Sequence, residues 1–129
     1  MNSLYWSVNP CDDETFSIFI RTVRNLISSN LDYDEGDGFT IYSNEAHGTP
    51  FSVYPDDEGF RFCKTSSRSY THDVMRCLIL MVEMGMVTEV SALADPGFLA
   101  ILDEVNTKVA LSTYNSQKKY FTELDYDDI

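Results

Sequence analysis

The most apolar stretch of the chain runs from Val74 to Val87, and only Arg76, Glu83 and Gly85 within it are not apolar. A helix that is apolar on nearly every side must be surrounded by the rest of its domain. We therefore expect a buried central helix here. The stretch falls short of the roughly 20 apolar residues that cross a bilayer, and two charges interrupt it, so we expect no membrane span.

The two ends of this helix carry residues that favour helix termini. Thr71 is expected at the N-cap, where its side chain accepts a backbone N–H bond, and Asp73 in the first turn, where a carboxylate offsets the positive end of the helix. Gly85 suits the left-handed C′ position that often ends a helix.

An amphipathic helix is predicted near the N-terminus, after the acidic residues 12–14. Its apolar positions recur at helical spacing, and we expect it to end near residues 28–30. These positions are Phe16, Phe19, Ile20, Val23, Leu26 and Ile27. Before it, the run from Leu4 to Val8 is either an edge strand or a segment that packs Trp6 on the core.

Three strands are predicted where apolar and polar residues alternate, at 39–43, 51–54 and 60–64. In the last of them Phe60 and Phe62 form the apolar side. Pro55 and Gly59 supply the turn between the second and third strands. Because the strands follow one another closely, we expect an antiparallel meander with one apolar face against the helices.

A further helix is predicted after Asp95 as N-cap and Pro96 as the first helical residue. Its apolar stripe consists of Phe98, Ile101, Leu102, Val105 and Val109. The pattern over 110–124 fits either a hairpin that turns at Asn115 or a continued helix, and the turn residue favours the hairpin.

These elements indicate an α+β fold: an N-terminal helix, a three-stranded antiparallel meander, the buried central helix, a further helix and a possible C-terminal hairpin. A chain of 129 residues has enough apolar residues for one core. We expect a single domain over 1–122 and an acidic tail over 123–129.

The net charge of −12 disfavours direct contact with nucleic acid or anionic lipid and favours a basic partner surface. Cys11, Cys63 and Cys77 are odd in number, and the N-terminus does not resemble a secretion signal. We therefore expect a cytoplasmic protein with reduced thiols.

The candidates for catalysis are the pairs His72 with Asp73 and His72 with Cys77, while His47 lies in a loop. No motif places a nucleophile, a base and an orienting group together, so we do not expect an enzyme. Cys63, His72 and Cys77 lack the spacing of a zinc site, and we expect no metal and no cofactor.

The acidic loop that begins at Asp32 superficially resembles a calcium-binding loop. An EF-hand in this register needs Gly where Asp37 stands and a bidentate Glu where Ser43 stands, and Glu45 comes two residues too late. A solvated acidic loop is the better interpretation.

Four short clusters contain 14 of the 21 carboxylates. They lie at residues 12–14, 32–37, 56–58 and 123–128. If they form one patch, carboxylates on a rigid surface resemble the phosphates of a nucleic acid and could occupy a nucleic-acid-binding protein. The alternative is that the charge only keeps the protein soluble.

In element order and acidity, with the stretches LDYDEGDG, YPDDEG and ELDYDD, the chain resembles the small acidic inhibitors that bacteriophages make against restriction and CRISPR systems. The resemblance implies a non-enzymatic protein that mimics nucleic acid and blocks a nucleic-acid-binding host protein in the host cytoplasm. The expected contact residues are Asp32, Tyr33, Asp34, Glu35, Asp37, Tyr54, Asp56, Asp57 and Glu58.

The same features also resemble type III secretion chaperones. That resemblance implies a homodimer that binds an effector segment, with Phe98, Ile101 and Val105 at an apolar interface. An enzyme of another kind is the third alternative.

Overall fold

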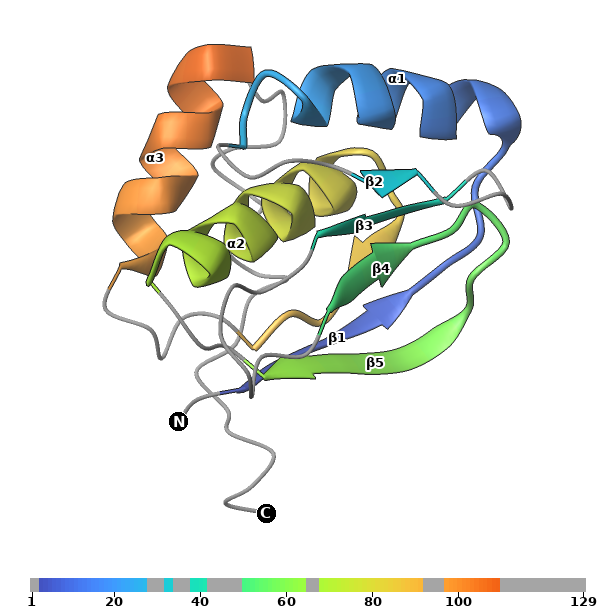
Figure 1. Ribbon diagram of the computed structural model, residues 1–129, viewed down its shortest axis with the longest axis horizontal. Coiled ribbons are helices and arrows are strands. Elements are labelled where there is room, and N and C mark those ends of the chain that lie inside the picture. Colours follow the sequence, from blue (N-terminus) through green and yellow to red (C-terminus); the bar gives the residue numbers. More distant parts are fainter. Residues whose placement is uncertain are drawn as a thin grey trace.

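The computed structural model describes residues 3–27, 32–33, 38–41, 50–64, 68–91 and 97–109, and it confirms an α+β fold (Figure 1). The helices are α1 (Asp13–Val23), α2 (Arg68–Glu83) and α3 (Phe98–Val109). The strands are β1 (Ser3–Val8), β2 (Asp32–Tyr33), β3 (Phe39–Ile41), β4 (Phe51–Val53), β5 (Gly59–Lys64) and β6 (Val87–Thr88). Within these ranges, no helix is long and apolar enough to cross a membrane.

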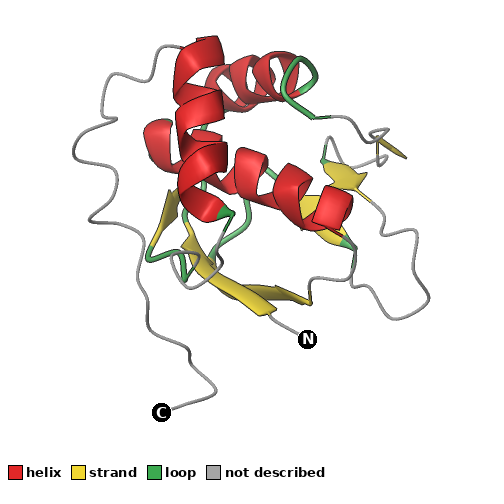
Figure 2. Ribbon diagram, turned by 90° about the vertical axis from the view of Figure 1, so that its left-hand side faces the viewer, coloured by secondary structure: helices red, strands yellow, loops and turns green. Residues whose placement is uncertain are grey.

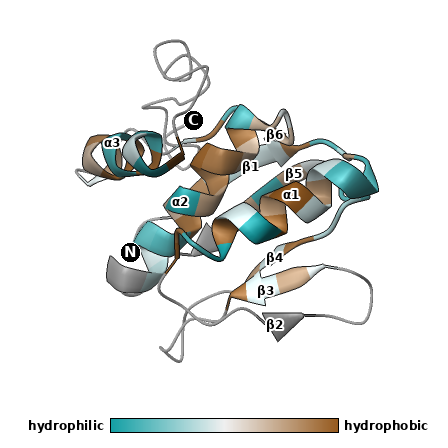
Figure 3. Ribbon diagram, turned by 90° about the horizontal axis from the view of Figure 1, so that it is seen from above, coloured by the Kyte–Doolittle hydropathy of each residue, from teal (hydrophilic) through white to brown (hydrophobic). Residues whose placement is uncertain are grey.

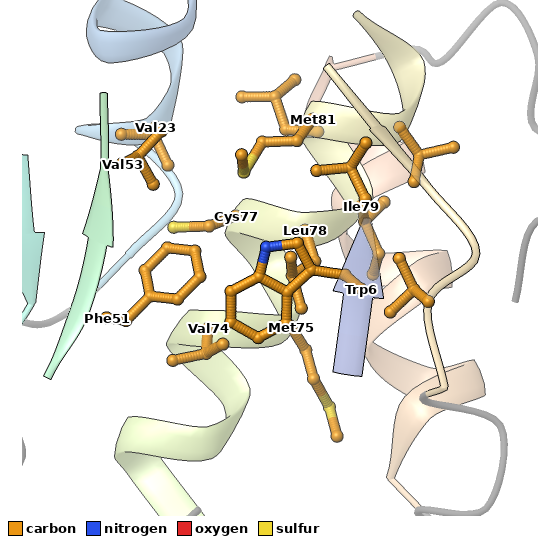
Figure 4. Packing of buried hydrophobic residues seen from close by; sticks show 14 of the residues in the cluster. Trp6, Val23, Phe51, Val53, Val74, Met75, Cys77, Leu78, Ile79 and Met81 are labelled. Atoms are coloured by element: carbon orange, nitrogen blue, oxygen red, sulfur yellow. The ribbon is translucent and has the colours of Figure 1, made fainter. Parts of the chain in front are cut away.

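Helix α2 is the buried central helix that the sequence predicts. Along α2, Val74, Met75, Cys77 and Ile79 are fully shielded from solvent. Figure 4 shows this helix between strands, with the ring of Trp6 and the ring of Phe51 directed toward it. Figure 3 shows by colour that α2 is apolar along most of its length, whereas polar and apolar residues alternate on α1 and α3.

The C-terminal end of α2 is confirmed, but its predicted N-cap is wrong. Gly85 has φ of 75°, its N–H donates to Val82 O at 3.1 Å, and Met86 N–H donates to Met81 O at 2.8 Å. This is the Schellman arrangement, which satisfies the last carbonyls of the helix. At the other end α2 already begins at Arg68, so Thr71 and Asp73 lie inside the helix and not at its start.

The predicted antiparallel pairing is confirmed for the first two strands of the meander and is wrong for the third, although strands exist in all three predicted segments. In the described part of the chain, β2, β3 and β4 form one antiparallel sheet, and β5 joins a second sheet with the order β5-β1-β6. β5 runs antiparallel to β1 with Leu4 opposite Cys63 and Trp6 opposite Arg61. The pairing is non-local, because β5 and β6 lie far from β1 in the sequence, and Leu4, Trp6 and Val8 on one face of β1 are buried in the core.

The alternation in β5 is correct, but its apolar side faces the other way. Trp6 is 5% exposed and lies in the core, whereas Phe60 and Phe62, which alternate with the residue opposite Trp6, are exposed. β1 is therefore the central strand of its sheet and not an edge strand, and the prediction that its segment packs Trp6 on the core is confirmed.

Helices α1 and α3 pack around α2 with their predicted apolar stripes. α1 ends at Val23, earlier than predicted, because Asn25 N–H and Leu26 N–H bond to carbonyls three residues back and tighten the chain into turns. In α3, Phe98, Ile101, Leu102 and Val105 are buried.

The remaining predictions fall on parts of the chain that the structure does not describe. Asp95 and Pro96, residues 110–124 and the acidic tail lie outside the described residues. The same holds for the loop that contains His47 and for Ser43 and Glu45.

We predict that Gly85→Ala lowers the free energy of unfolding by about 1 kcal/mol, because a side chain disfavours the left-handed conformation. A Cβ at this position would meet no atom within 4 Å, so the effect is confined to the backbone. Gly85→Asn should lose less, since Asn tolerates this region better. Urea denaturation measures both variants, and equal stability of Gly85→Ala and the parent would contradict the assignment.

Candidate binding surface

The turn between β4 and β5 carries three of the predicted contact residues, Asp56, Asp57 and Glu58. Asp57 N–H donates to Tyr54 O at 3.2 Å, and Gly59 closes the turn with φ of 106°. The sequence P-D-D-E-G folds in this way because Pro favours the start of a turn and Gly allows positive φ at its end.

The three carboxylates of this turn differ in their surroundings. Asp57 is partly buried and forms an ion pair with Arg61, and the same guanidinium donates from Nη2 to Glu58 O at 3.0 Å. Asp56 and Glu58 are exposed. Asp57 therefore stabilises the turn, and Asp56 and Glu58 are the carboxylates that a partner can reach.

A second acidic cluster begins α1. Asp12 is its N-cap and accepts the Thr15 N–H at 2.7 Å, while Asp13 and Glu14 follow in the first turn. The hydrogen bonds from Thr15 hold the pKa of Asp12 below its ordinary value. Carboxylates at the N-terminus of a helix also offset the positive end of its dipole.

One backbone hydrogen bond joins these two clusters. Cys11 N–H, directly before the N-cap, donates to Pro55 O in the β4–β5 turn at 2.9 Å. Residues 12–14 and 56–58 therefore lie at the same end of the molecule, on the right in Figure 1. We call this the acidic end. The thiol of Cys11 lies in the negative field of the acidic end. Burial is the main cause that raises the pKa of this thiol, and the charges of Asp12 and Asp13 raise it further.

The other predicted contact residues have mixed outcomes. The backbone of Asp32 and Tyr33 forms β2, paired with Thr40 and Phe39 of β3, but their side chains are not described. Asp34, Glu35 and Asp37 lie outside the described residues.

Tyr54 is half-buried, and its ring covers Gly38 so closely that a Cβ at Gly38 would lie 2.6 Å from Val53 O and would overlap the ring. Tyr54, which was predicted to contact the partner, thus also has a structural role. Tyr54 also lines an open groove of about 310 Å³ with Trp6, Phe51 and Phe62.

A group of aromatic rings at the surface was not predicted, with Phe60 and Phe62 exposed and Tyr5 half-buried. Tyr5 on β1 lies against Phe60 and Phe62 on β5, with ring centroids 5.7 and 6.4 Å apart. We call these three residues the aromatic platform. The signal in the sequence is the alternation of residues 60–64, but alternation alone does not tell which side of a strand faces the core.

The apolar stripe expected at a dimer interface is not exposed. Phe98, Ile101 and Val105 are buried within the chain, on the helix that packs against α2. That expectation is therefore wrong for these three residues. On α3 the large apolar residue that faces solvent is Leu99.

The residues considered for catalysis lie in or beside the core. Cys77 is fully buried, and burial raises the pKa of its thiol well above the ordinary value, which keeps it protonated and unreactive. Asp73 is 0% exposed and forms an ion pair with Arg76 at 2.6 Å, and Arg76 in turn contacts Glu104 of α3 at 2.7 Å. This network links α2 to α3. His72 is half-buried on α2.

Among the described residues, no group of three or more His, Cys, Asp and Glu side chains is arranged to hold a metal ion. The side chain of Cys63 and most of the acidic loop from Asp32 are not described. Comparisons with protein-family models, with curated proteins and with solved structures found no match to this chain.

We predict that Arg76→Leu destabilises the protein by about 3 to 5 kcal/mol, because it removes a cation from the buried carboxylate of Asp73. The double variant Asp73→Asn/Arg76→Leu should recover part of this loss, since the buried charge is then absent. Chemical denaturation measures both variants. A single variant as stable as the parent would contradict the pairing.

A pH dependence follows from the other half of the network. The hydrogen bonds from Arg76 hold the pKa of Glu104 below its ordinary value of 4.5. The stability that this contact contributes is therefore complete above that value and is lost as the pH falls through the lower pKa of the folded state. Glu104→Gln should be less stable than the parent near neutral pH, and the difference should shrink below about pH 4. A difference independent of pH would contradict the assignment.

Proposed function

We propose that the protein is a non-enzymatic inhibitor whose acidic end docks on the basic surface of a nucleic-acid-binding protein and keeps nucleic acid away from it. The partner is a protein that binds phosphates through Lys and Arg side chains. The carboxylates of the acidic end take the place of the phosphates on these side chains. In the context of the phage inhibitors that the chain resembles, the partner would be a host defence protein.

The observation that carries this proposal is the hydrogen bond between Cys11 N–H and Pro55 O. It brings together two acidic clusters that lie more than 40 positions apart in the sequence. Without it, the clusters would be separate charged loops, which the solubility interpretation explains as well.

Local contacts also support the acidic end. Asp12 is held by its N-cap hydrogen bond, and the turn at 55–59 is held by Asp57 and Arg61. Asp13, Glu14, Asp56 and Glu58 remain exposed on this support. Carboxylates gathered at one end of a molecule create a negative potential that attracts a basic partner.

We predict that Asp56→Lys/Glu58→Lys weakens binding to the partner by about ten-fold or more and reduces the salt dependence of the remaining binding. The test immobilises the protein, exposes it to bacterial lysate at low and at high salt, and identifies the retained proteins by mass spectrometry. The expected result is a nucleic-acid-binding protein that is lost at high salt and is displaced by added duplex DNA.

The matched control is Glu89→Lys/Asp103→Lys, which changes the net charge by the same amount at exposed positions after β6 and on α3. It should retain the partner. If both double variants lose the partner equally, only net charge matters, and the proposed docking of the acidic end is wrong. Retention of a partner that DNA does not displace would argue against mimicry.

A further inference from the structure

Two of the three rings in the aromatic platform, Phe60 and Phe62, are more exposed than phenylalanine side chains usually are. Phe60 is 51% exposed and Phe62 is 53% exposed, although both lie in a regular strand beside the core. The rings are also ordered relative to one another, since Tyr5 stacks on Phe60 with an interplanar angle of 28° and lies at 34° to Phe62. A contiguous surface of this kind indicates a binding role.

The platform lies on the outer face of the sheet. Tyr5 stands opposite Phe62 and Ser7 opposite Phe60 in the β1–β5 pair, so their side chains share one face, and Trp6 opposite Arg61 occupies the other. Helices α1 and α2 lie on one face of these strands, as Figures 1 and 2 show together, and Figure 4 shows Trp6 directed toward α2 on that face. The outer face thus carries aromatic rings where an antiparallel sheet usually carries polar residues.

The carboxylates beside the aromatic platform indicate which kind of ligand it binds. Only Gly59 separates Phe60 from the exposed carboxylate of Glu58, and Asp56 belongs to the same turn. An aromatic surface bordered by carboxylates suits a cation that can also stack, and the arginine guanidinium does both. Nucleic acid bases stack on such rings too, but their phosphates would meet the acidic end.

We propose that the aromatic platform binds an arginine-bearing segment of the basic partner, with guanidinium groups stacked on the rings and paired with Glu58 and Asp56. This inference rests on the proposed function. It specifies which side chains of the partner contact the surface beside the acidic end. Phe60 and Phe62 are two positions apart on β5, which is about 7 Å along a strand. An extended segment with arginine at alternate positions has the same spacing.

The experiment measures fluorescence anisotropy with two labelled peptides of equal length and charge. In one peptide arginine alternates with serine, and in the other lysine alternates with serine. We expect both to bind the parent protein at low salt, the arginine peptide about five-fold more tightly. Phe60→Thr/Phe62→Thr should remove this preference while the lysine peptide binds as before.

Two further variants control for structure. Leu99→Thr removes an equally exposed apolar side chain, 53% exposed, from α3 and should keep the arginine preference. Phe60→Tyr/Phe62→Tyr retains the rings and should keep it as well. Circular dichroism and urea denaturation establish that each variant is folded, and threonine suits a strand position.

The outcomes separate this inference from the function on which it rests. If neither peptide binds, docking of the acidic end on a basic surface fails, and the inference fails with it. If both peptides bind equally, or if the threonine variant keeps the preference, the platform has no part in recognition while acidic docking stands. Tighter binding of single-stranded DNA, or a dimer in light scattering that the threonine variant abolishes, would also overturn the inference.

Discussion

Helix α2 has apolar residues on nearly every side, and a helix of this kind is stable in water only when other elements surround it. This requirement explains why α1 and α3 pack against α2 and why strands from both sheets direct Trp6 and Phe51 toward it. Each fully buried side chain of this size contributes roughly 1.5 to 3 kcal/mol relative to an exposed one. The burial of α2 also sets the place of the acidic end, because the connections before α1 and after β4 must lie outside this core.

The polar groups of α2 meet the same constraint in a different way. The side chain of Arg76 is mostly buried, and its guanidinium contacts Asp73 on its own helix and Glu104 on α3. A buried ion pair adds little net stability, but breaking one leaves a charge in a medium that solvates it poorly. The network therefore specifies how α3 sits on α2 more than it strengthens their contact. The network also gives Asp73 a structural role near the core. This role weakens any catalytic interpretation of the neighbouring His72 and Cys77.

Local patterns predicted the elements well and their partners poorly. The helical spacing of Phe16, Phe19 and Val23 and the position of Gly85 depend on neighbours within a few residues, and both were confirmed. The pairing of β5 with β1 depends on residues more than 50 positions apart, and alternation within one strand carries no information about it. The same limit applied to the candidate site. The residues of the acidic clusters are evident in the sequence, but the meeting of two of them, 12–14 and 56–58, through Cys11 and Pro55 is a product of the fold, as is the outward direction of Phe60 and Phe62.

The inversion of β5 connects the fold to its proposed role. Arg61 lies on the inward side of the strand, where it pairs with Asp57 and leaves the phenylalanines outside. One register of β5 therefore secures the turn of the acidic end and exposes the aromatic rings beside it. The turn places Asp56 and Glu58 next to β5 in the chain, and carboxylates beside aromatic rings suit an arginine better than charge or an apolar surface does alone.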